Sequence, residues 1–302
     1  MRYRHAALWN RPVSTLGFGA SPLGGVYGAF DESDGIKAVH QAVEAGINFF
    51  DVAPFYGYTR AETALGKALS SLPRDQYLLS TKIGRYGERE FDFSAARTRQ
   101  SLQESLDRLQ TDVLDLVICH DIEYVNPEIV TEEALPVLQE YKQQGIIKAI
   151  GLSGYPLPAL QDLITKSGSF DVVLTYGHFN LFNTTLLAAL PFFQEHGLSV
   201  IAASPLAQGL LTAGGVPEWH TASPLLQQAC QAATTHCKQA GISLAQLAMQ
   251  YAATLEGVIT TLVGMGTTKE VEQNTSWWEA LIDPALLAEV QAIFAPVKDM
   301  SW

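Results

Sequence analysis

The stretch Ile47-Asn-Phe-Phe-Asp-Val-Ala-Pro-Phe-Tyr56 begins with a short apolar run and delivers two ionisable side chains, Asp51 and Tyr56. Later apolar runs of similar length end near Lys82 and near His120. Short runs that are continuously apolar are typical of parallel strands covered on both faces. We therefore expect a parallel sheet in which several strands carry an ionisable side chain at the same end.

The same pattern repeats along the whole chain. The apolar runs cover 14–18, 47–50, 77–81, 113–119, 146–151, 171–175, 198–203 and 258–263. Helical patterns lie between them, at 32–45, 60–71, 94–109, 132–144, 156–166, 184–195, 224–253 and beyond 268. Strands that alternate with helices in this way predict an α/β fold, a (β/α)₈ TIM barrel that spans residues 1–302 as a single domain. The regions 204–223 and 296–302 are expected to form long loops at its C-terminal mouth.

A doubly wound sheet is the alternative fold. It would be expected to carry a Gly-x-Gly-x-x-Gly turn after the first strand. The corresponding stretch, Gly17-Phe-Gly-Ala-Ser-Pro22, has a proline where the third glycine belongs. The barrel is therefore favoured.

Residues at the ends of the helical patterns agree with these bounds. Thr59 and Glu62 have the spacing of a capping box at a helix start. Gly46, Gly145 and Gly197 each follow a helical pattern, where a C-terminal glycine is common.

Composition excludes several classes of function. The chain has 302 residues and a net charge of −12, which argues against nucleic-acid and anionic-membrane partners. It has no apolar run of membrane-spanning length and no signal-peptide pattern after Met1, so a cytoplasmic protein is expected. Cys119, Cys230 and Cys237 are interpreted as reduced structural thiols. No Cys and His spacing indicates a metal site.

The four ionisable side chains suit proton transfer in carbonyl–alcohol redox chemistry. A tyrosine titrates near pH 10, and we expect the Lys82 ammonium, held by Asp51, to lower the pKa of Tyr56. Tyr56 would then be the general acid for reduction or the general base for oxidation, and His120 would orient the substrate oxygen. A cofactor must carry the hydride. The alternative is structural: an ion pair between Asp51 and Lys82, a surface anchor at Tyr56 and a satisfied histidine at 120.

Several motifs resemble the aldo-keto reductase family. They are Gly46-Ile-Asn-Phe-Phe-Asp51 with Tyr56-Gly57, Glu62 with Leu65-Gly-Lys67, Ser80-Thr-Lys82, Leu102 to Asp115 with Cys119-His120, and Gly151-Leu-Ser153. The resemblance runs essentially from end to end of the chain. It implies a (β/α)₈ barrel that binds a nicotinamide cofactor without a Rossmann fingerprint, and a catalytic tetrad of Asp51, Tyr56, Lys82 and His120.

Further stretches are similar to the sugar-oxidising members of that family. They are Gly17 to Gly24, Gly84-Arg-Tyr86, Phe91-Asp-Phe-Ser94, Cys119-His-Asp-Ile-Glu123, Ala203-Ser-Pro-Leu206, Pro217-Glu-Trp-His220 and Pro296-Val-Lys298. This resemblance implies oxidation of the C1 hydroxyl of an aldose, L-galactose or a relative such as L-fucose, to the lactone. The chain would act on this small sugar as a monomer or a weak homo-oligomer. The alternatives are a pyridoxal 4-dehydrogenase, a general carbonyl reductase and a nucleotide-sensing binding module.

The resemblance also suggests cofactor ligands, although some positions depart from the family pattern. The usual Ser-Asn pair is Ser153-Gly154, the usual glutamine is Tyr176, and the usual stacking tyrosine falls at Ala203. Ser153 and Tyr176 are therefore expected to contact the carboxamide. The pyrophosphate segment would supply Ser204, Leu206, Gln208 and Gly209, and Gln273 and Asn274 would contact the adenine.

The choice between NAD and NADP rests on two positions. The family binds the 2′-phosphate of NADP with cationic side chains, but here the lysine position holds Gly264 and the arginine position holds Glu270. A carboxylate repels a phosphate and accepts hydrogen bonds from ribose hydroxyls, so NAD is expected rather than NADP. The alternatives are that Glu270 only interacts favourably with its helix dipole, or that Lys269 reaches a phosphate.

Aromatic and hydrogen-bonding side chains near the expected mouth suit a sugar ring. The candidates for substrate contact are Phe55, Tyr86, Phe91, His178, Phe179 and Trp219. Each of them is alternatively a packing residue.

Overall fold

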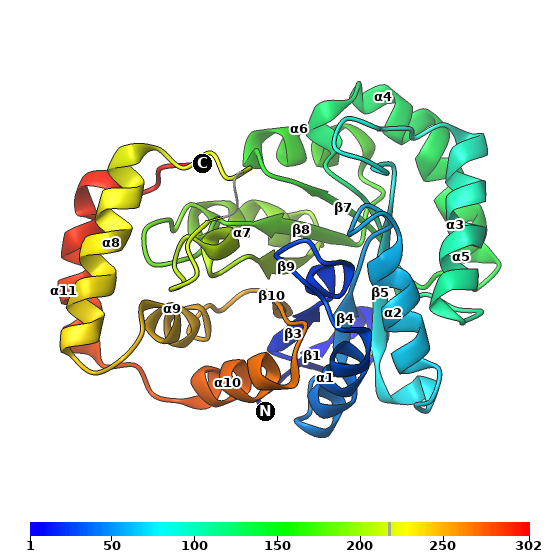
Figure 1. The fold of residues 1–302 in the computed structure, drawn as a ribbon. Helices are drawn as coiled ribbons and strands as arrows, with labels where there is room; N and C mark the ends of the chain where they lie inside the picture. The colour runs from blue at the N-terminus through cyan, green and yellow to red at the C-terminus, as the bar shows by residue number, and fades with distance from the viewer. Residues whose placement is uncertain (217–218) are drawn as a thin grey trace.

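The computed structural model describes residues 1–216 and 219–302. Pro217 and Glu218, which belong to the motif at 217–220, lie outside the described residues. Eight parallel strands form a closed barrel in the order β10-β3-β4-β5-β6-β7-β8-β9, and helices surround them (Figure 1). The predicted (β/α)₈ fold is confirmed.

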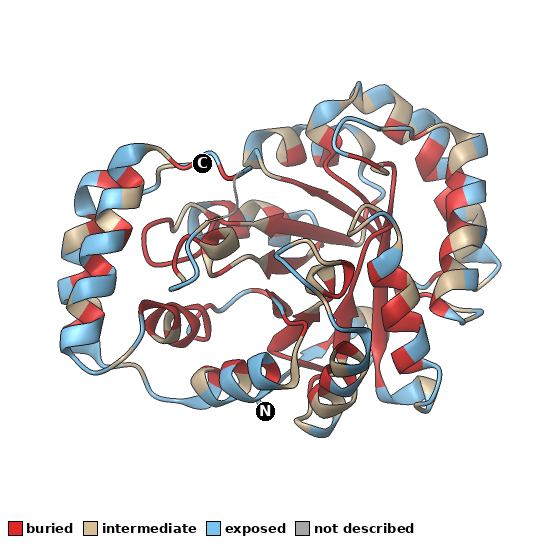
Figure 2. Cartoon of the chain, viewed as in Figure 1, coloured by how far each residue is buried: buried red, intermediate tan, exposed pale blue. Residues whose placement is uncertain are grey.

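The barrel strands agree with the predicted apolar runs to within a few residues. They are β3 (Leu16–Gly19), β4 (Phe49–Asp51), β5 (Leu78–Ile83), β6 (Leu116–Cys119), β7 (Ile150–Gly154), β8 (Val172–Tyr176), β9 (Ser199–Ala203) and β10 (Thr260–Gly264). Phe49, Leu78, Leu116 and Ile118 belong to one buried cluster inside the barrel. Alternate residues such as Phe50 and Leu79 pack in a second cluster against the helices. Burial on both faces explains why the runs are continuously apolar (Figure 2).

The helices also follow the predicted pattern, with one long stretch divided in two. They are α1 (Glu32–Glu44), α2 (Arg60–Leu69), α3 (Ala95–Leu109), α4 (Pro127–Ile129), α5 (Leu135–Gln143), α6 (Leu157–Ser167), α7 (Leu186–Glu195), α8 (Pro224–Gln239), α9 (Leu244–Ala252), α10 (Thr268–Glu279) and α11 (Pro284–Phe294). The predicted helix 224–253 breaks between α8 and α9, where Gly241 has a φ of 82° and Ser243 caps the next helix.

An N-terminal hairpin closes the end of the barrel opposite the mouth, and sequence patterns did not predict it. Strands β1 (Tyr3–Ala6) and β2 (Arg11–Ser14) pair antiparallel. The Trp9 ring lies 5.8 Å from the Phe49 ring, and its indole N–H donates to the Asp115 carbonyl at 3.0 Å. The strands are short and rich in charged residues, so they lack the apolar pattern of the barrel strands.

The predicted capping box at Thr59 and Glu62 is wrong. Thr59 has a left-handed φ of 72° and makes no side-chain cap. Glu62 is fully buried, where its carboxylate accepts from the Thr81 hydroxyl at 2.6 Å and from Arg108 Nε at 2.7 Å. Glu62 therefore connects α2 to β5 and α3. The predicted C-terminal glycines are confirmed, since Gly46, Gly145 and Gly197 have positive φ angles.

The last part of the chain leaves the barrel and returns to its mouth. Helices α8 and α11 pack side by side at the edge of the molecule in Figure 1. Within residues 1–216 and 219–302, no single helix is long and apolar enough to cross a membrane. The segments Thr268–Glu279 and Pro284–Val297 reach that length and apolar character only together, and they are bent by 107° relative to each other. Cys119, Cys230 and Cys237 are buried free thiols, as predicted.

Candidate active site

Three adjacent strands and one loop bring the predicted tetrad together at the C-terminal mouth. Asp51 ends β4, Lys82 lies near the end of β5, and His120 follows β6. The strands are in register, with Asp51 beside Ser80 and Lys82 beside Ile118. Tyr56 lies in the loop after β4, with its ring perpendicular to the His120 ring at 5.7 Å. The mouth is where barrel enzymes carry their catalytic groups.

Asp51 and Lys82 form a buried ion pair at the base of this group. Lys82 Nζ contacts Asp51 Oδ1, and it also donates to the Val52 carbonyl at 2.9 Å. The Ser80 hydroxyl donates to the other Asp51 oxygen at 2.9 Å. Burial raises the pKa of the Asp51 carboxyl, and the charge and hydrogen bonds of Lys82 oppose this shift. The pair holds the ammonium 4.9 Å from the centre of the Tyr56 ring.

The pKa of Tyr56 moves in the opposite direction to the one predicted. Burial raises it well above 10, and the nearby charges of Asp51 and Asp121 add to the rise. Arg85 opposes this shift only in part. The expectation that Lys82 lowers this pKa considered one cation and neglected burial and two carboxylates. The Tyr56 phenol therefore keeps its proton at neutral pH, which suits a general acid.

His120 is a neutral imidazole in this site. Burial lowers its pKa to about 3, although the neighbouring Asp121 carboxylate opposes this change. Its Nε2 lies 3.6 Å from Asp121 Oδ2, and its Nδ1 is buried without a hydrogen-bond partner among the described residues. A neutral imidazole can donate one N–H to a substrate oxygen without adding charge.

Two charged residues of the mouth were not among the predicted site residues. Arg85 follows β5 and Asp121 follows His120, and Arg85 Nη1 contacts Asp121 Oδ2. The Arg85 guanidinium lies 4.0 Å above the Phe55 ring. Both residues are part of stretches that resemble sugar-oxidising members of the family, Gly84-Arg-Tyr86 and Cys119 to Glu123. That resemblance was the only available signal.

The predicted carboxamide ligands lie next to this group. The inward-facing Ser153 on β7 is fully buried, and its hydroxyl accepts from the Asp121 N–H at 3.3 Å. A side chain at Gly154 would collide with Glu123 Oε2, which lies 2.6 Å from the position of its Cβ. The Glu123 carboxylate thus occupies the space that the side chain of the family's usual asparagine would need at position 154. Its other oxygen accepts from the Tyr155 N–H at 2.8 Å.

Tyr176 and Ala203 sit side by side at the ends of β8 and β9. Burial raises the pKa of the Tyr176 phenol strongly, with Asp121 and Glu123 adding to the shift, so the ring stays neutral. The side chain at Ala203 is small, and the Tyr176 ring packs against the Tyr155 ring at 5.5 Å between ring centres. This arrangement fits a flat ring, such as a nicotinamide.

The predicted pyrophosphate segment is an irregular turn after β9. Ser204, Ala207 and Gln208 all have left-handed φ angles, and Leu206 and Gly209 lie between and after them. The Trp302 indole N–H donates to Gln208 Oε1 at 3.1 Å, and the Trp302 ring stacks on His220 at 5.6 Å. The C-terminal residue therefore lies over the mouth and touches the segment expected to hold the cofactor.

The predicted adenosine end of the site is the start of α10. Glu270 Oε2 accepts from the Gly266 N–H at 2.8 Å and the Thr267 N–H at 3.1 Å, and Thr267 caps the helix in return. Gly264 is exposed, and of the two residues predicted at the adenine, Gln273 is exposed and Asn274 is buried. The Glu270 carboxylate therefore caps the N-terminus of α10, which agrees with the alternative that it interacts with its own helix.

The predicted substrate residues fall into two groups of three, and the first group lies at the mouth. Phe55 packs against His120, at 6.2 Å between ring centres, and Phe91 lies 5.4 Å from the Arg85 guanidinium. Trp219 is exposed on the other side of the mouth, 6.1 Å from the Tyr27 ring. These three residues surround the mouth.

The other three predicted substrate residues have structural contacts that occupy their polar groups. The Tyr86 hydroxyl accepts from the Gly84 N–H at 3.1 Å, and its ring lies under Arg97. His178 bonds the Thr185 hydroxyl and the Tyr155 carbonyl through its two nitrogens. Phe179 stacks on Tyr251 at 4.9 Å, outside the barrel and against α7. The contacts of these three residues fit the alternative reading, packing, and their contact with substrate stays a prediction.

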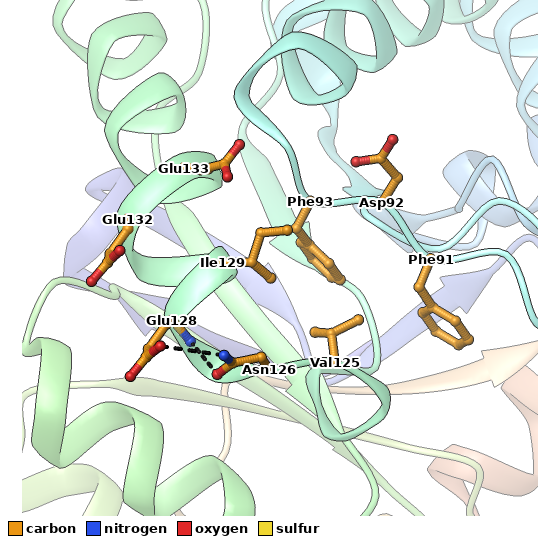
Figure 3. A pocket seen from close by; sticks show the side chains of 9 residues that line it. All are labelled: Phe91, Asp92, Phe93, Val125, Asn126, Glu128, Ile129, Glu132 and Glu133. Atoms are coloured by element: carbon orange, nitrogen blue, oxygen red, sulfur yellow. Dashed lines mark hydrogen bonds between the residues drawn. The ribbon is translucent and has the colours of Figure 1, made fainter.

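A groove beside the mouth is shown in Figure 3. It has a volume of about 470 Å³ and lies between the loop after β5 and the segment that leads into α5. Phe93, Val125 and Ile129 form its apolar wall, and Glu128, Glu132 and Glu133 lie along its rim. No tetrad residue lines it, but Phe91, one of the predicted substrate residues, does.

Comparisons with known proteins agree with this geometry. The model of the Aldo/keto reductase family matches residues 15–295. The chain is 45% identical to L-galactose dehydrogenase of Arabidopsis thaliana, over 96% of this chain and 93% of that protein. It is 37% identical to D-arabinose 1-dehydrogenase of Saccharomyces cerevisiae, over 80% of this chain and 75% of that protein. The holo form of an aldo-keto reductase from Bacillus halodurans superposes with a TM-score of 0.81 at 26% identity, covering 100% and 98% of the two chains.

Proposed function

This chain belongs to the aldo/keto reductase family, and we propose that it is an NAD-dependent aldose 1-dehydrogenase. The family and the relatives make it an oxidoreductase that acts on CH–OH donors with a nicotinamide cofactor and a small-molecule substrate. The proposed reaction is oxidation of the C1 hydroxyl of L-galactose, or of a relative such as L-fucose, to the lactone. The observation that carries this proposal is the 45% identity to a plant L-galactose dehydrogenase over 96% of the chain.

Tyr56 is the proposed proton-transfer group. As a phenol it gives its proton to a carbonyl oxygen during reduction, and as a phenolate it takes the C1 hydroxyl proton during oxidation. The nicotinamide, when bound, supplies the hydride acceptor or donor that no side chain provides. The Lys82 ammonium, held by Asp51, lies close enough to stabilise the phenolate as it forms.

His120 is the proposed orienting group for the substrate oxygen. Its pKa of about 3 keeps it neutral, so it donates an N–H and does not compete with Tyr56 as an acid. The Tyr56 and His120 rings lie 5.7 Å apart and perpendicular to each other, and both groups are proposed to contact the same substrate oxygen. Ser153 and Tyr176 are proposed to hold the nicotinamide, since both face into the barrel next to His120.

The preference for NAD is supported by the charge at the start of α10. Glu270 accepts from the Gly266 and Thr267 N–H groups, and its negative charge would repel a 2′-phosphate placed near it. The chain carries no cation at 264 or 270. In NAD, by contrast, both ribose hydroxyls are free, and they would donate hydrogen bonds to the Glu270 carboxylate.

A cofactor reduction screen tests this function. Purified enzyme is assayed with NAD⁺ and with NADP⁺ on L-galactose, L-fucose, D-arabinose and pyridoxal, and Tyr56→Phe serves as the inactive control. We expect the highest kcat/KM with L-galactose and NAD⁺. Turnover restricted to pyridoxal would replace the sugar assignment, and equal turnover of the Tyr56→Phe variant would reject the role of Tyr56.

A further inference from the structure

Asp121, which directly follows His120, has an unsatisfied carboxylate oxygen, as does Glu123 two residues further on. The Asp121 side chain is 3% exposed, and its Oδ1 is buried without a hydrogen-bond partner among the described residues. A buried acceptor that lacks a donor destabilises the folded protein. Asp121 also has a left-handed φ of 54°, which a non-glycine residue rarely adopts. Asp121 lies next to the groups proposed to react. We therefore expect a bound ligand to supply the hydrogen-bond donor that Asp121 Oδ1 lacks.

Carboxylates with a structural role in this protein look different. At the other end of the barrel, Asp115 Oδ2 accepts from Arg74 Nη2 at 2.6 Å and from the Leu79 N–H at 2.8 Å. Asp171 likewise bonds Lys142 through both oxygens and accepts from the Ile150 N–H at 2.8 Å. Both carboxylates thus bind the backbone of a neighbouring strand. Asp121 accepts from no backbone N–H in the described chain, so it does not fasten one strand to another.

The partner of Asp121 also has unused hydrogen-bonding capacity. Arg85 uses Nη1 for Asp121, and its Nε lies 3.4 Å from the Gly87 carbonyl. Its Nη2 has no hydrogen bond to a described residue. The ion pair therefore has one unused acceptor, Asp121 Oδ1, and one unused donor, Arg85 Nη2, among the described residues. A hydroxyl group both donates and accepts, so two neighbouring hydroxyls complement this pair.

The position of the Arg85–Asp121 pair determines which substrate hydroxyls it would contact. Asp121 Oδ2 lies 3.6 Å from His120 Nε2, next to the group proposed to hold the reacting oxygen. The Arg85 guanidinium lies over Phe55 at 4.0 Å and near Phe91 at 5.4 Å, so an aromatic surface borders the pair. A substrate whose reacting oxygen is at His120 would place its adjacent carbons against Asp121 and Arg85.

We propose that the Arg85–Asp121 pair is the specificity determinant for polyhydroxylated substrates: Asp121 accepts a hydrogen bond from a hydroxyl next to the reacting carbon, and Arg85 donates to a neighbouring hydroxyl. The inference rests on the proposed function for its substrate class, a sugar. It assigns recognition of the substrate hydroxyls to two residues outside the tetrad.

The test compares two aldehydes that differ only in their hydroxyls, D-glyceraldehyde and propanal. Both are reduced with NADH by the wild type, by Asp121→Asn and by Asp115→Asn, the matched control at the opposite end of the barrel. The readout is the ratio of kcat/KM for glyceraldehyde to kcat/KM for propanal. Effects of Asp121 on His120 or Tyr56 act on both aldehydes and cancel in this ratio.

We expect Asp121→Asn to lower the ratio about 5- to 10-fold, because the amide oxygen still accepts but the stronger hydrogen bond to a charged acceptor is lost. Asp115→Asn should leave the ratio unchanged. Arg85→Gln combined with Asp121→Asn removes both charges together, so it leaves no unpaired charge if the single variant folds poorly. It should lower the ratio by at least as much as Asp121→Asn, because the hydrogen bond from Arg85 is lost as well.

A ratio that changes less than about twofold in both Asp121 variants overturns the inference, since such a loss is smaller than one hydrogen bond. A wild type that does not prefer glyceraldehyde overturns it as well. The aldose screen above is independent of this comparison. If no aldose is oxidised but the ratio still depends on Asp121, the proposed function fails and the inference stands.

Discussion

Tyr56 illustrates how a residue's chemistry depends on its surroundings. Its place after the strand that ends in Asp51 is evident from the sequence, but its protonation state is not. Burial and the charges of Asp51 and Asp121 raise its pKa well above 10, while Lys82 lies 4.9 Å from its ring. Oxidation requires the phenolate and reduction requires the phenol, so the same shift affects the two directions in opposite ways.

The pH dependence of the two reactions follows from this shift. Below the pKa of Tyr56 the phenolate fraction rises tenfold for each pH unit, so kcat/KM for aldose oxidation should rise steadily from about pH 7 to pH 10. Reduction should be flat over the same range, because the phenol predominates. His120, with a pKa of about 3, should add no inflection near pH 6.5. Initial rates in both directions measure this, and a plateau in oxidation below about pH 9 would contradict it.

Glu270 is the second residue whose role can be tested alone. Glu270→Gln keeps a side-chain acceptor for the capping box but removes the negative charge. We expect kcat/KM for NADP⁺ relative to NAD⁺ to rise about 5- to 30-fold, because a repulsion of roughly 1–2 kcal/mol is removed. Glu272→Gln, on an exposed position of the same helix, is the control. An unchanged cofactor ratio in Glu270→Gln would exclude charge repulsion as its basis.

At the scale of elements, Glu62 and Gly66 show how α2 is attached to its neighbours. Glu62 is fully buried and bonds Thr81 on β5 and Arg108 on α3. Gly66 lies so close to α3 that a Cβ would be 2.1 Å from the Arg108 carbonyl. The family motif Glu62 with Leu65-Gly-Lys67 therefore has a packing explanation. The helix must approach α3 closely so that the buried carboxylate can reach both partners.

Loss of the Glu62 carboxylate should destabilise the fold. Glu62→Ala removes the close partner of the Arg108 guanidinium and leaves only Glu104, 3.9 Å from its Nη1. We expect the free energy of unfolding to fall by about 2–4 kcal/mol. Glu32→Ala removes an exposed ion pair with Lys67 and should cost about 0–1 kcal/mol. Urea unfolding of both variants provides the measurement. Equal small effects would show that the buried pair contributes little to the stability of the protein.

At the scale of the whole molecule, the C-terminal residue brings distant loops together at the mouth. The Trp302 ring lies 5.9 Å from the Tyr155 ring and 5.6 Å from the His220 ring, and its N–H bonds Gln208. These partners follow β7 and β9, so the contacts join loops on one side of the barrel. The segment expected to hold the pyrophosphate is thereby linked to the end of the chain.

Trp302→Phe tests this link, because it keeps an aromatic ring and removes the N–H donor. If the bond to Gln208 holds the segment in place, the Kd for NADH should rise about 2- to 10-fold, as expected for one hydrogen bond of about 0.5–1.5 kcal/mol. Trp277→Phe, on the partly buried face of α10, is the control. Titration followed by NADH fluorescence measures both. An unchanged Kd for Trp302→Phe would mean that Gln208 needs no such support.

Most of the fold and the tetrad could be predicted from the sequence because their signals are local. Each barrel strand is short and apolar on both faces, and Asp51, Lys82 and His120 lie where such runs end. The hairpin of β1 and β2 was missed, since its strands lack that apolar pattern. Among the predicted substrate residues, Tyr86, His178 and Phe179 have structural contacts.

The sequence by itself therefore determined the barrel, the family and the position of Asp51, Lys82 and His120 at strand ends, because strand periodicity and strand ends are properties of neighbouring residues. Only the tertiary structure decided the pKa of Tyr56, the buried role of Glu62 and the pairing of Arg85 with Asp121. Burial and electrostatic fields come from residues far apart in the chain, and they exist only when the barrel has closed.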